Sequence, residues 1–199
     1  MTRIGVLGGT FDPPHIGHLL LAEYTAEALE LDTVLFVPAG VQPLKDDIRS
    51  VVEHRVAMVE RAIEGNPQFA LSRVDVDRTG PHYTADTLRL LQEQYPNSTL
   101  YFLMGGDNLR DFPKWTRPDE IIAQARLAVM RRSDEDVHAD MHAQILPSLA
   151  ERVDMVDTPL LSIWLSSTHV VERIQQGLSV RYLVLDDVLA YIEANGLYK

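Results

Sequence analysis

The stretch GGTFDPPHIGH, residues 8–18, lies between the first apolar run of the chain and its first helical pattern. The run before it, RIGVLG at residues 3–8, is short, rich in branched apolar residues and ends in glycine, which predicts a buried strand. After it, apolar residues recur at helical spacing over residues 16–29. The quoted stretch is therefore predicted to form the turn that joins a strand to a helix.

The same alternation of strand and helix patterns continues along the chain. It predicts a doubly wound, Rossmann-like α/β fold, with a parallel sheet, right-handed crossovers and helices on both faces. A helical C-terminal tail follows, in which Asp186 is expected to cap the last helix and Asn195-Gly196 to close it. The expected strands are 4–7, 34–37, 69–72, 100–104, 127–130 and 153–156, and the expected helices are 16–29, 51–64, 84–95, 119–125, 167–176 and 186–194.

Length and composition limit the class of protein. A chain of 199 residues with 46% hydrophobic content is typical of one globular domain, here 1–199. The net charge of −11 argues against a general nucleic-acid or membrane-surface binder, because such proteins need a basic face. The chain has no cysteine, no basic-then-apolar leader and no apolar run of membrane-spanning length, so we expect a soluble cytoplasmic protein.

The opening turn has the residues of an anion site. Gly8 and Gly9 let the backbone approach a ligand, and the helix that follows presents its positive dipole end. His15 and His18 are three residues apart, so they share one helix face and can donate to phosphate oxygens. The alternative is a tight turn whose histidines only cap or solvate the helix. The histidine pair, the Asp-Pro-Pro spacer and the place after the first strand together favour the anion site.

The sequence HIGH at residues 15–18 resembles the HxGH signature of the nucleotidyltransferase superfamily, and GGTFDPPHIGH is similar to the bacterial nicotinate-mononucleotide adenylyltransferases. The resemblance runs from Arg3 to Tyr198. It implies transfer of AMP from ATP to nicotinate mononucleotide in NAD biosynthesis, with Mg²⁺ carried on ATP and pyrophosphate rather than by a protein metal site. It also implies catalytic roles for His15 and His18 and ATP contacts from Gly8, Gly9, Thr10, Phe11 and His18, with Thr10 also near the second nucleotide.

Two further stretches resemble substrate-binding elements of this family. VPAGVQPLK, residues 37–45, implies that Lys45 contacts phosphates and takes part in catalysis, and it lies in the irregular stretch 38–50, a candidate mobile loop. DRTGPHYTADTL, residues 77–88, implies that backbone amides at Tyr83 and Thr84 receive the nicotinate carboxylate. A solvated surface lysine and an ordinary Gly-Pro turn are the respective alternatives.

Two later stretches complete the resemblance. MGGDNLRDFPKW, residues 104–115, implies that Asp107 holds nucleotide hydroxyls and that Trp115 stacks on the pyridine ring, although tryptophan is more often a core residue. LSSTHVVERI, residues 165–174, implies ATP-phosphate contacts from the start of a late helix, although hydroxyl residues there can also be ordinary N-caps. The residues concerned are Ser166, Ser167 and Thr168.

The chain departs from the family pattern where an arginine is usual, because Val171 stands there. Arg173 or Arg132 compensates, or ATP binding is weaker than in relatives. The resemblance is weakest over residues 133–152, where His138 and His142 are four apart on an expected helix. Such spacing can bind a metal, but a solvated acidic helix is favoured, so no metal site is predicted.

Three other functions are alternatives to this one. Pantetheine-phosphate adenylyltransferases share HxGH but are shorter and lack the GPHYTADTL and DNLRDFPKW elements. A non-catalytic nucleotide-binding module gains weight from Val171. A fragment of a tRNA synthetase is disfavoured, since the chain has no KMSKS-like loop and no basic face. The expected partners are ATP and nicotinate mononucleotide, without nucleic acid or membrane; a homo-oligomer and the preference for nicotinate over nicotinamide stay open.

Overall fold

The computed structural model describes residues 1–40, 49–132, 136–158 and 165–199. Six parallel strands form one sheet in the order β3-β2-β1-β4-β5-β6, which is the doubly wound order expected from the sequence. The order reverses between β1 and β4, so a crevice opens there at the carboxyl ends of the strands. The strands are β1 (Thr2–Gly9), β2 (Thr33–Pro38), β3 (Phe69–Leu71), β4 (Ser98–Gly105), β5 (Ala125–Arg132) and β6 (Val153–Thr158).

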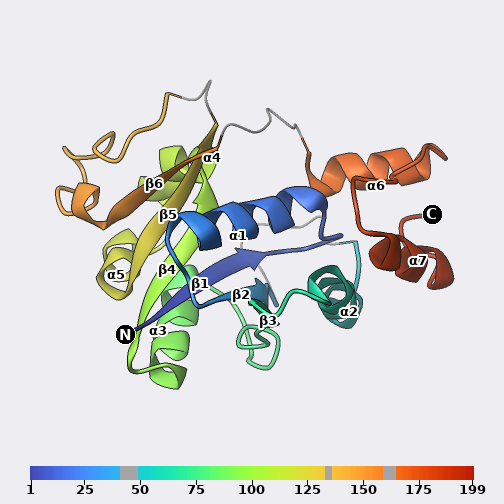
Figure 1. Cartoon of the computed structure of the whole chain (residues 1–199), viewed down its shortest axis with the longest axis horizontal. Coiled ribbons are helices and arrows are strands. Elements are labelled where there is room, and N and C mark those ends of the chain that lie inside the picture. Colours follow the sequence, from blue (N-terminus) through green and yellow to red (C-terminus); the bar gives the residue numbers. More distant parts are fainter. Residues whose placement is uncertain (41–48, 133–135, 159–164) are drawn as a thin grey trace.

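Helices lie on both faces of this sheet (Figure 1). They are α1 (Ile16–Ala28), α2 (Val52–Ile63), α3 (Thr84–Gln94), α4 (Gly106–Asp111), α5 (Pro118–Gln124), α6 (Ser167–Gln175) and α7 (Asp186–Ala194), with short 3₁₀ turns at Phe112–Lys114 and Ala150–Arg152. Within the described residues, no helix is long and apolar enough to cross a membrane.

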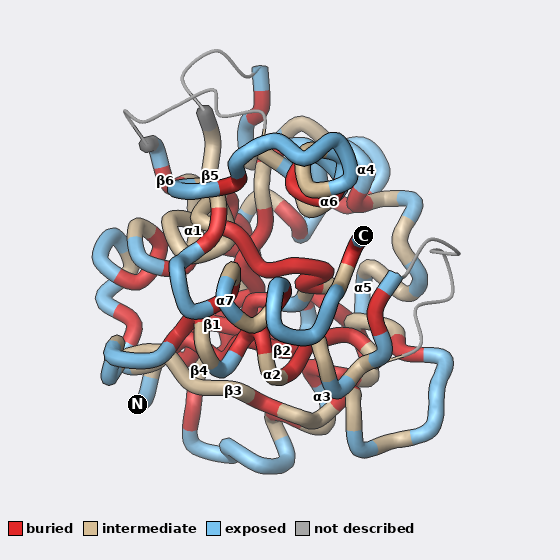
Figure 2. Tube along the Cα trace, turned by 90° about the vertical axis from the view of Figure 1, so that its right-hand side faces the viewer, coloured by how far each residue is buried: buried red, intermediate tan, exposed pale blue. Residues whose placement is uncertain are grey.

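Two apolar layers hold the helices to the sheet, and Figure 2 shows the buried strands at the centre of the molecule. On one face, Leu88 of α3 and Ile121 of α5 pack against alternate residues of the strands, among them Val6. On the other face, Ala22 of α1 and Val59 of α2 pack against the remaining set. The strands are apolar on both sides, because a parallel sheet is covered on both faces.

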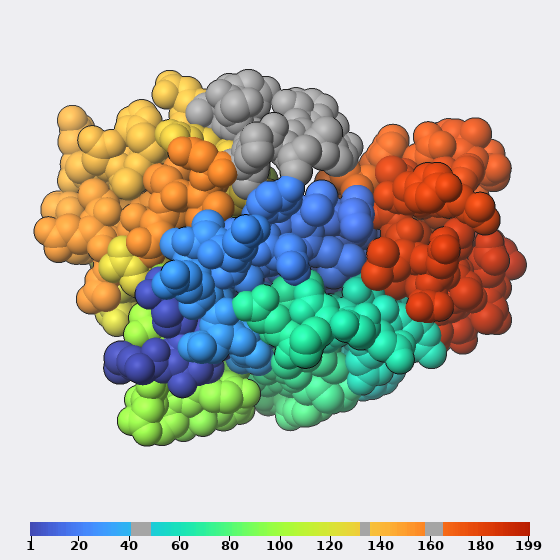
Figure 3. All heavy atoms as spheres, viewed as in Figure 1, coloured from blue at the N-terminus to red at the C-terminus, as the bar shows by residue number. Residues whose placement is uncertain are grey.

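The C-terminal helices pack on α2 rather than on the sheet. Val171 of α6 and Val188 of α7 are fully buried against Met58 of α2. Figure 3 shows these C-terminal residues lying against the segments of α1 and α2. This packing brings the start of α6 beside the turn between β1 and α1, where Ser167 Oγ donates a hydrogen bond of 2.8 Å to the carbonyl of Pro13.

The predicted strands and helices are confirmed, with ends that differ by no more than two residues. Two local predictions are wrong. Asp186 does not cap α7, because Leu185 is the N-cap and Asp186 is the first helical residue, where its charge suits the helix dipole. His138 and His142 do not share a helix, since residues 139–145 form turns. A hydrogen bond of 2.8 Å between the His142 ring and the carbonyl of Leu109 holds these turns against α4.

Candidate active site

A cavity of about 560 Å³ opens at the carboxyl ends of β1 and β4, at the point where the strand order reverses. Its walls include the turn after β1, the starts of α3 and α6, and the segment that follows α4. Ligands of open α/β sheets bind at this point of the fold. The cavity therefore lies where the sequence predicted the anion site.

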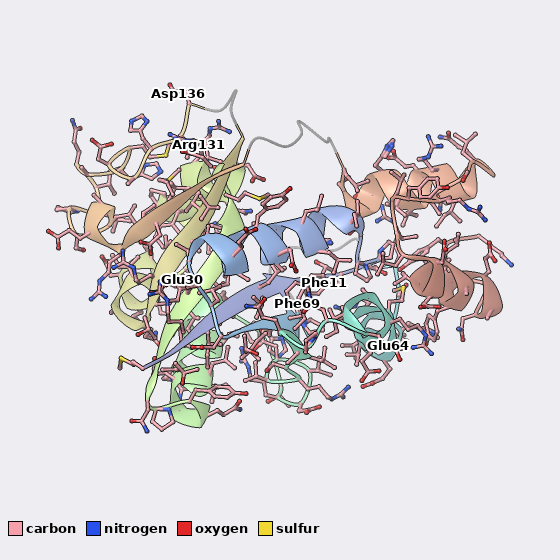
Figure 4. The ribbon with its side chains drawn as sticks, in the orientation of Figure 1. Phe11, Glu30, Glu64, Phe69, Arg131 and Asp136 are labelled. Atoms are coloured by element: carbon pink, nitrogen blue, oxygen red, sulfur yellow. The ribbon has the colours of Figure 1, made fainter. Side chains whose placement is uncertain are left out.

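The turn after β1 is shaped around Phe11. Phe11, labelled in Figure 4, has a left-handed φ of 51° and is buried. Its ring lies edge-on to the His18 ring, with the centroids 5.0 Å apart. A Cβ on Gly9 would come within 2.9 Å of the Phe11 ring, so a larger residue at position 9 would displace it. Glycine is required here by close packing as well as by access of a ligand to the backbone.

The two histidines of the turn lie on one another but differ in position. Their rings stack at 3.7 Å, and the backbone N–H of His15 donates to Nδ1 of His18 at 3.2 Å. When Nδ1 accepts, a neutral imidazole carries its proton on Nε2, so this bond fixes His18 with Nε2 as the donor. His18 lines the cavity, whereas His15 is not among its lining residues.

His15 forms the support beneath His18. It is 8% exposed, and this burial lowers its pKa from 6.5 to about 4, so the ring is neutral at pH 7. A Cβ on Gly17 would meet the His15 ring at 3.1 Å, which leaves little room for any other residue there. The glycine of the HIGH stretch thus allows the stacked pair to form.

The amides that begin α1 differ from the prediction. The N–H of Ile16 donates to the carbonyl of Leu183 at 2.9 Å, and the N–H of His18 donates to the carbonyl of His15 at 2.9 Å. These two amides are already bonded to protein acceptors, so an anion at the start of α1 would need other donors. The dipole of the helix and the side chain of His18 remain on the cavity side.

Buried polar residues fix the turn from behind. Arg55 of α2 is 2% exposed and donates to the carbonyls of Thr10 and Ala39 at 2.9 and 2.7 Å, which joins the ends of β1 and β2. The sequence analysis did not single out Arg55. Its signal was a charged residue on the apolar face of the predicted helix 51–64, with Val52 three residues before it and Val59 four residues after it.

Asp12 connects the turn to two other parts of the chain. Its carboxylate is buried and accepts from the N–H groups of Arg49 and Ser50 at 2.7 and 3.1 Å, and from the hydroxyl of Tyr198 at 2.6 Å. Asp12 therefore holds the residues after the 41–48 segment, and nearly the last residue of the chain, against the opening turn. The sequence analysis read Asp12 only as part of a spacer.

The start of α6 contributes to the same wall. Ser166 is the N-cap, and its Oγ accepts from the N–H of His169 at 3.1 Å, as the capping alternative expected. Ser167 and Thr168 line the cavity, while Ser166 is exposed outside the lining. The three hydroxyl residues are thus divided between a helix cap and the cavity wall.

The opposite wall is built by α3. Tyr83 is its N-cap, Thr84 its first residue, and both line the cavity. The N–H groups of Thr84 and Ala85 have no acceptor among the described residues, in contrast to those of Ile16 and His18 in α1. Of the two amides predicted to receive a carboxylate, those of Tyr83 and Thr84, the Thr84 amide is thus without a protein acceptor among the described residues, and its role as a carboxylate donor stays a prediction.

Trp115 lies on this wall and also contacts the core. Its ring packs against Phe102 and Phe112, with centroids 5.9 and 5.7 Å away, and it lines the cavity while half-buried. The ring thus makes the core contacts of the alternative interpretation and also lies at the cavity, while its stacking on a pyridine ring stays a prediction. Asp107 is exposed at the start of α4 and is not among the lining residues, whereas its neighbour Asn108 is.

The basic residues of the site differ from those expected. Lys45 lies outside the described residues. Val171 is fully buried, and Arg173 donates to the carbonyl of Ser179 at 2.9 and 2.8 Å, so Arg173 does not replace the missing arginine in the cavity. The side chain of Arg132 is not described.

Arg49 is the single lysine or arginine among the described residues that line the cavity. The sequence analysis did not name it, because nothing in its surroundings distinguishes it from a solvated loop residue. Among residues 1–40, 49–132, 136–158 and 165–199, no group of three or more His, Cys, Asp or Glu side chains could hold a metal ion.

Comparison with known proteins places this geometry in a family. The cytidylyltransferase-like family model matches residues 6–173. A relative from Roseiflexus sp. (strain RS-1), named "Probable nicotinate-nucleotide adenylyltransferase", is 45% identical over 197 residues, which is 98% of either chain. A relative of the same name from Oceanobacillus iheyensis is 39% identical over 198 residues, covering 100% of this chain and 97% of its own.

The fold is also that of a solved structure. The Plasmodium falciparum nicotinic acid mononucleotide adenylyltransferase complexed with NaAD matches with a TM-score of 0.83 and 19% identity, over 100% of this chain and 98% of its own. At this identity the likeness concerns the fold. The sequence relatives, matched over nearly their full length, give the narrower assignment: this chain belongs to the nicotinate-nucleotide adenylyltransferases, an enzyme family within the cytidylyltransferase-like group.

Proposed function

We propose that the chain, acting as one nucleotidyltransferase domain, transfers AMP from ATP to nicotinate mononucleotide and releases pyrophosphate. The observation that carries the proposal is the cavity at the sheet's switch point. One wall carries His18 and the start of α6, while the other carries the start of α3 and Trp115. Two nucleotides could be bound there with their phosphates towards each other.

The reaction is a displacement at phosphorus. A phosphate oxygen of nicotinate mononucleotide attacks the α-phosphorus of ATP, and the bond from that phosphorus to the oxygen bridging the β-phosphorus breaks. The electron pair of that bond leaves with pyrophosphate, and the product is nicotinate adenine dinucleotide. The attacking phosphate is already an anion near pH 7, with a second pKa of about 6 by analogy with phosphorylated side chains, so no general base is required.

The protein's task is to place the reactants and to stabilise charge on the phosphates. His18 would donate from Nε2 to the α-phosphate, and His15 supports its ring through the stack and the backbone hydrogen bond. Arg49, Ser167 and Thr168 would contact the phosphates from the same wall. We propose the same role for Lys45.

The second nucleotide would lie against α3. The open amides at Thr84 and Ala85 can donate hydrogen bonds to its ring carboxylate, and Trp115 offers a flat face for the pyridine ring. Asp107, exposed in the first turn of α4 beside the lining residue Asn108, would accept hydrogen bonds from the ribose hydroxyls. Mg²⁺ enters as part of the MgATP substrate and leaves with pyrophosphate. The cytoplasmic location and the homo-oligomeric state stay predictions.

The test is pyrophosphate release from MgATP with three acceptors in parallel: nicotinate mononucleotide, nicotinamide mononucleotide and phosphopantetheine. The proposal expects release with the first well above the other two. Measurable ATP binding without release from any acceptor would favour the non-catalytic binding module instead.

His18→Ala serves as the inactive control for that assay. We expect a folded protein that still binds nicotinate mononucleotide and has a barrier higher by roughly 2 to 4 kcal/mol, the scale of one lost transition-state donor. Unchanged turnover would remove His18 from the reaction.

A further inference from the structure

The first turn of α3 contains a charge that opposes its proposed ligand. Asp86 is the third residue of the helix, directly after the open amides of Thr84 and Ala85. An ionised carboxylate in this turn would repel the ring carboxylate of nicotinate mononucleotide, because like charges at short range destabilise each other. The ring amide of nicotinamide mononucleotide would not be repelled in this way.

Arg117 is paired with this carboxylate. Its Nη1 and Nη2 bond the two oxygens of Asp86 at 3.1 and 2.5 Å, which is a two-point pairing of guanidinium and carboxylate. The guanidinium carbon also lies 5.6 Å from the centroid of the Tyr83 ring, and Tyr83 is the residue that begins α3. Hydrogen bonding to Arg117 lowers the pKa of Asp86, so the pair is fully ionised at neutral pH.

The position of Arg117 connects the two parts of the acceptor wall. It follows directly after Trp115 and Thr116, which line the cavity, and it has a left-handed φ of 59° as the N-cap of α5. The side chain then crosses from this segment to α3. A second carboxylate, that of Glu120, lies 3.4 Å from Nη1, so the arginine balances more than one negative charge near the helix start.

We propose that Arg117 is a specificity-determining residue, which keeps the start of α3 receptive to a nucleotide with a ring carboxylate by neutralising Asp86. The inference rests on the proposed function and adds to it the residue that sets the acid-over-amide preference. Arg117 need not touch the substrate, because its effect is on the electrostatic potential at the helix start.

The test compares kcat/KM for nicotinate and nicotinamide mononucleotide in four proteins: the wild type, Arg117→Gln, Asp86→Asn and the double variant. Arg117→Gln removes the hydrogen-bonded counter-charge of Asp86, leaving only the longer-range attraction of Arg78 and Arg89, and should lower the acid-over-amide ratio about fivefold, within the range for a charge in a helix's first turn. Asp86→Asn removes a negative charge from the first turn of α3, leaves Arg117 with Glu120 as its remaining partner at 3.4 Å, and should raise the ratio. The double variant should return it to near the wild-type value.

A purely structural ion pair gives a different pattern. If the pair only holds α5 to α3, both single variants and the double variant would change the two substrates alike, and the inference is wrong. Opposite changes of the ratio in the two single variants cannot come from loosened packing. Thermal melting of each variant shows whether it is folded, and Asp86→Asn still provides the test if Arg117→Gln does not fold.

The Arg126–Asp154 pair offers a matched control. It is also a two-point pair, through Nε and Nη2 of Arg126 at 2.6 and 2.8 Å, and its side-chain exposures are 30% and 25% compared with 36% and 28% for Arg117 and Asp86. Arg126→Gln should leave the ratio unchanged, because this pair joins the amino ends of β5 and β6, at the edge of the sheet opposite the cavity and the start of α3. If wild-type protein releases no pyrophosphate with either nucleotide, the proposed function fails and this inference fails with it. A normal wild type with an unaltered ratio in Arg117→Gln defeats the inference alone.

Discussion

At the scale of single residues, Arg49 supplies a positive charge at the cavity of an acidic protein. The protein carries a net charge of −11, and its proposed substrate is a polyanion. Arg49 is the single arginine or lysine among the described lining residues, and its backbone is fixed by Asp12 at 2.7 Å. Since Val171 and Arg173 are engaged elsewhere, Arg49 stands in the place where a phosphate contact is needed.

Arg49→Gln should therefore raise the KM for ATP about tenfold, the equivalent of one charge-assisted hydrogen bond of about 1.4 kcal/mol, with a smaller effect on the KM for the second nucleotide. Steady-state kinetics with each substrate varied in turn would measure this. Arg181→Gln is the matched control, because Arg181 is exposed, carries the same charge and is not among the lining residues. Equal changes in both variants would mean that only net charge matters.

His15 gives a prediction about stability. Its pKa is 6.5 when the chain is unfolded and about 4 in the folded protein, because the ring is buried. Between these values the unfolded state binds more protons than the folded state, so stability falls as the pH falls from 6.5 towards 4. From pH 7 to pH 5 the contribution of His15 to this loss is about 2 kcal/mol.

Urea unfolding of the wild type and of His15→Asn at both pH values would measure that difference. Asparagine is a favoured N-cap and does not titrate, so the variant should lose about 2 kcal/mol less than the wild type between pH 7 and pH 5. Parallel losses in the two proteins would show that His15 is not held neutral by the fold.

At the scale of elements, two neighbouring serines at the start of α6 have different roles, one in the helix cap and one in the cavity wall. Ser166 Oγ caps the helix, whereas Ser167 Oγ bonds the carbonyl of Pro13 and its residue lines the cavity. Ser166→Ala should cost about 1 kcal/mol of folding stability with little change in KM for ATP. Ser167→Ala should instead raise the KM for ATP, because it frees α6 from the turn after β1. Thermal melting and kinetics on the pair would distinguish the two roles, and identical behaviour would contradict the division.

The elements themselves could be predicted because their patterns are local. Apolar runs such as residues 100–104 and helical spacing such as residues 16–29 follow from burial on one or both sides, and the alternation leads to the parallel sheet. Turn 8–18 could be recognised for the same reason, since its glycines and histidines are contiguous. Here local consistency between pattern and fold was sufficient.

Contacts between distant elements could not be predicted in this way. Three examples depend on how elements far apart in the chain pack. The N–H of Ile16 bonds the carbonyl of Leu183, Val171 is buried in the same cluster as residues of α7, and Arg117 reaches Asp86. A resemblance can name a residue, but a residue's availability is decided by its neighbours in space. The prediction that Asp186 caps α7 is wrong by one residue, because the end of a helix cannot be located more closely than that from a sequence pattern.

At the scale of the whole molecule, the C-terminal end of the chain contacts the N-terminal turn at the proposed ATP side of the cavity. Tyr198 lies 186 residues from Asp12 in sequence, yet its buried hydroxyl donates to the Asp12 carboxylate at 2.6 Å. The same carboxylate holds Arg49 and Ser50, so one buried acceptor joins the N-terminal turn, the end of the 41–48 segment and the C-terminal tail. The tail thus acts on the site through Asp12, although α7 itself does not line the cavity.

Tyr198→Phe should lower the free energy of unfolding by about 2 kcal/mol, because it removes a hydrogen bond to a buried charged group. It should also raise the KM for ATP, since Asp12 would hold Arg49 less firmly. Removal of Lys199 alone, an exposed residue, should change neither quantity, whereas removal of Tyr198 and Lys199 together should lower the stability further by exposing the apolar surface of Met58 and α7. Urea unfolding and ATP kinetics on these three proteins would show whether the contact affects stability, the site or both. If Tyr198→Phe keeps the wild-type stability but has an altered KM for ATP, the contact acts on site geometry alone. If Tyr198→Phe is less stable but has unaltered kinetics, the tail has only a structural role.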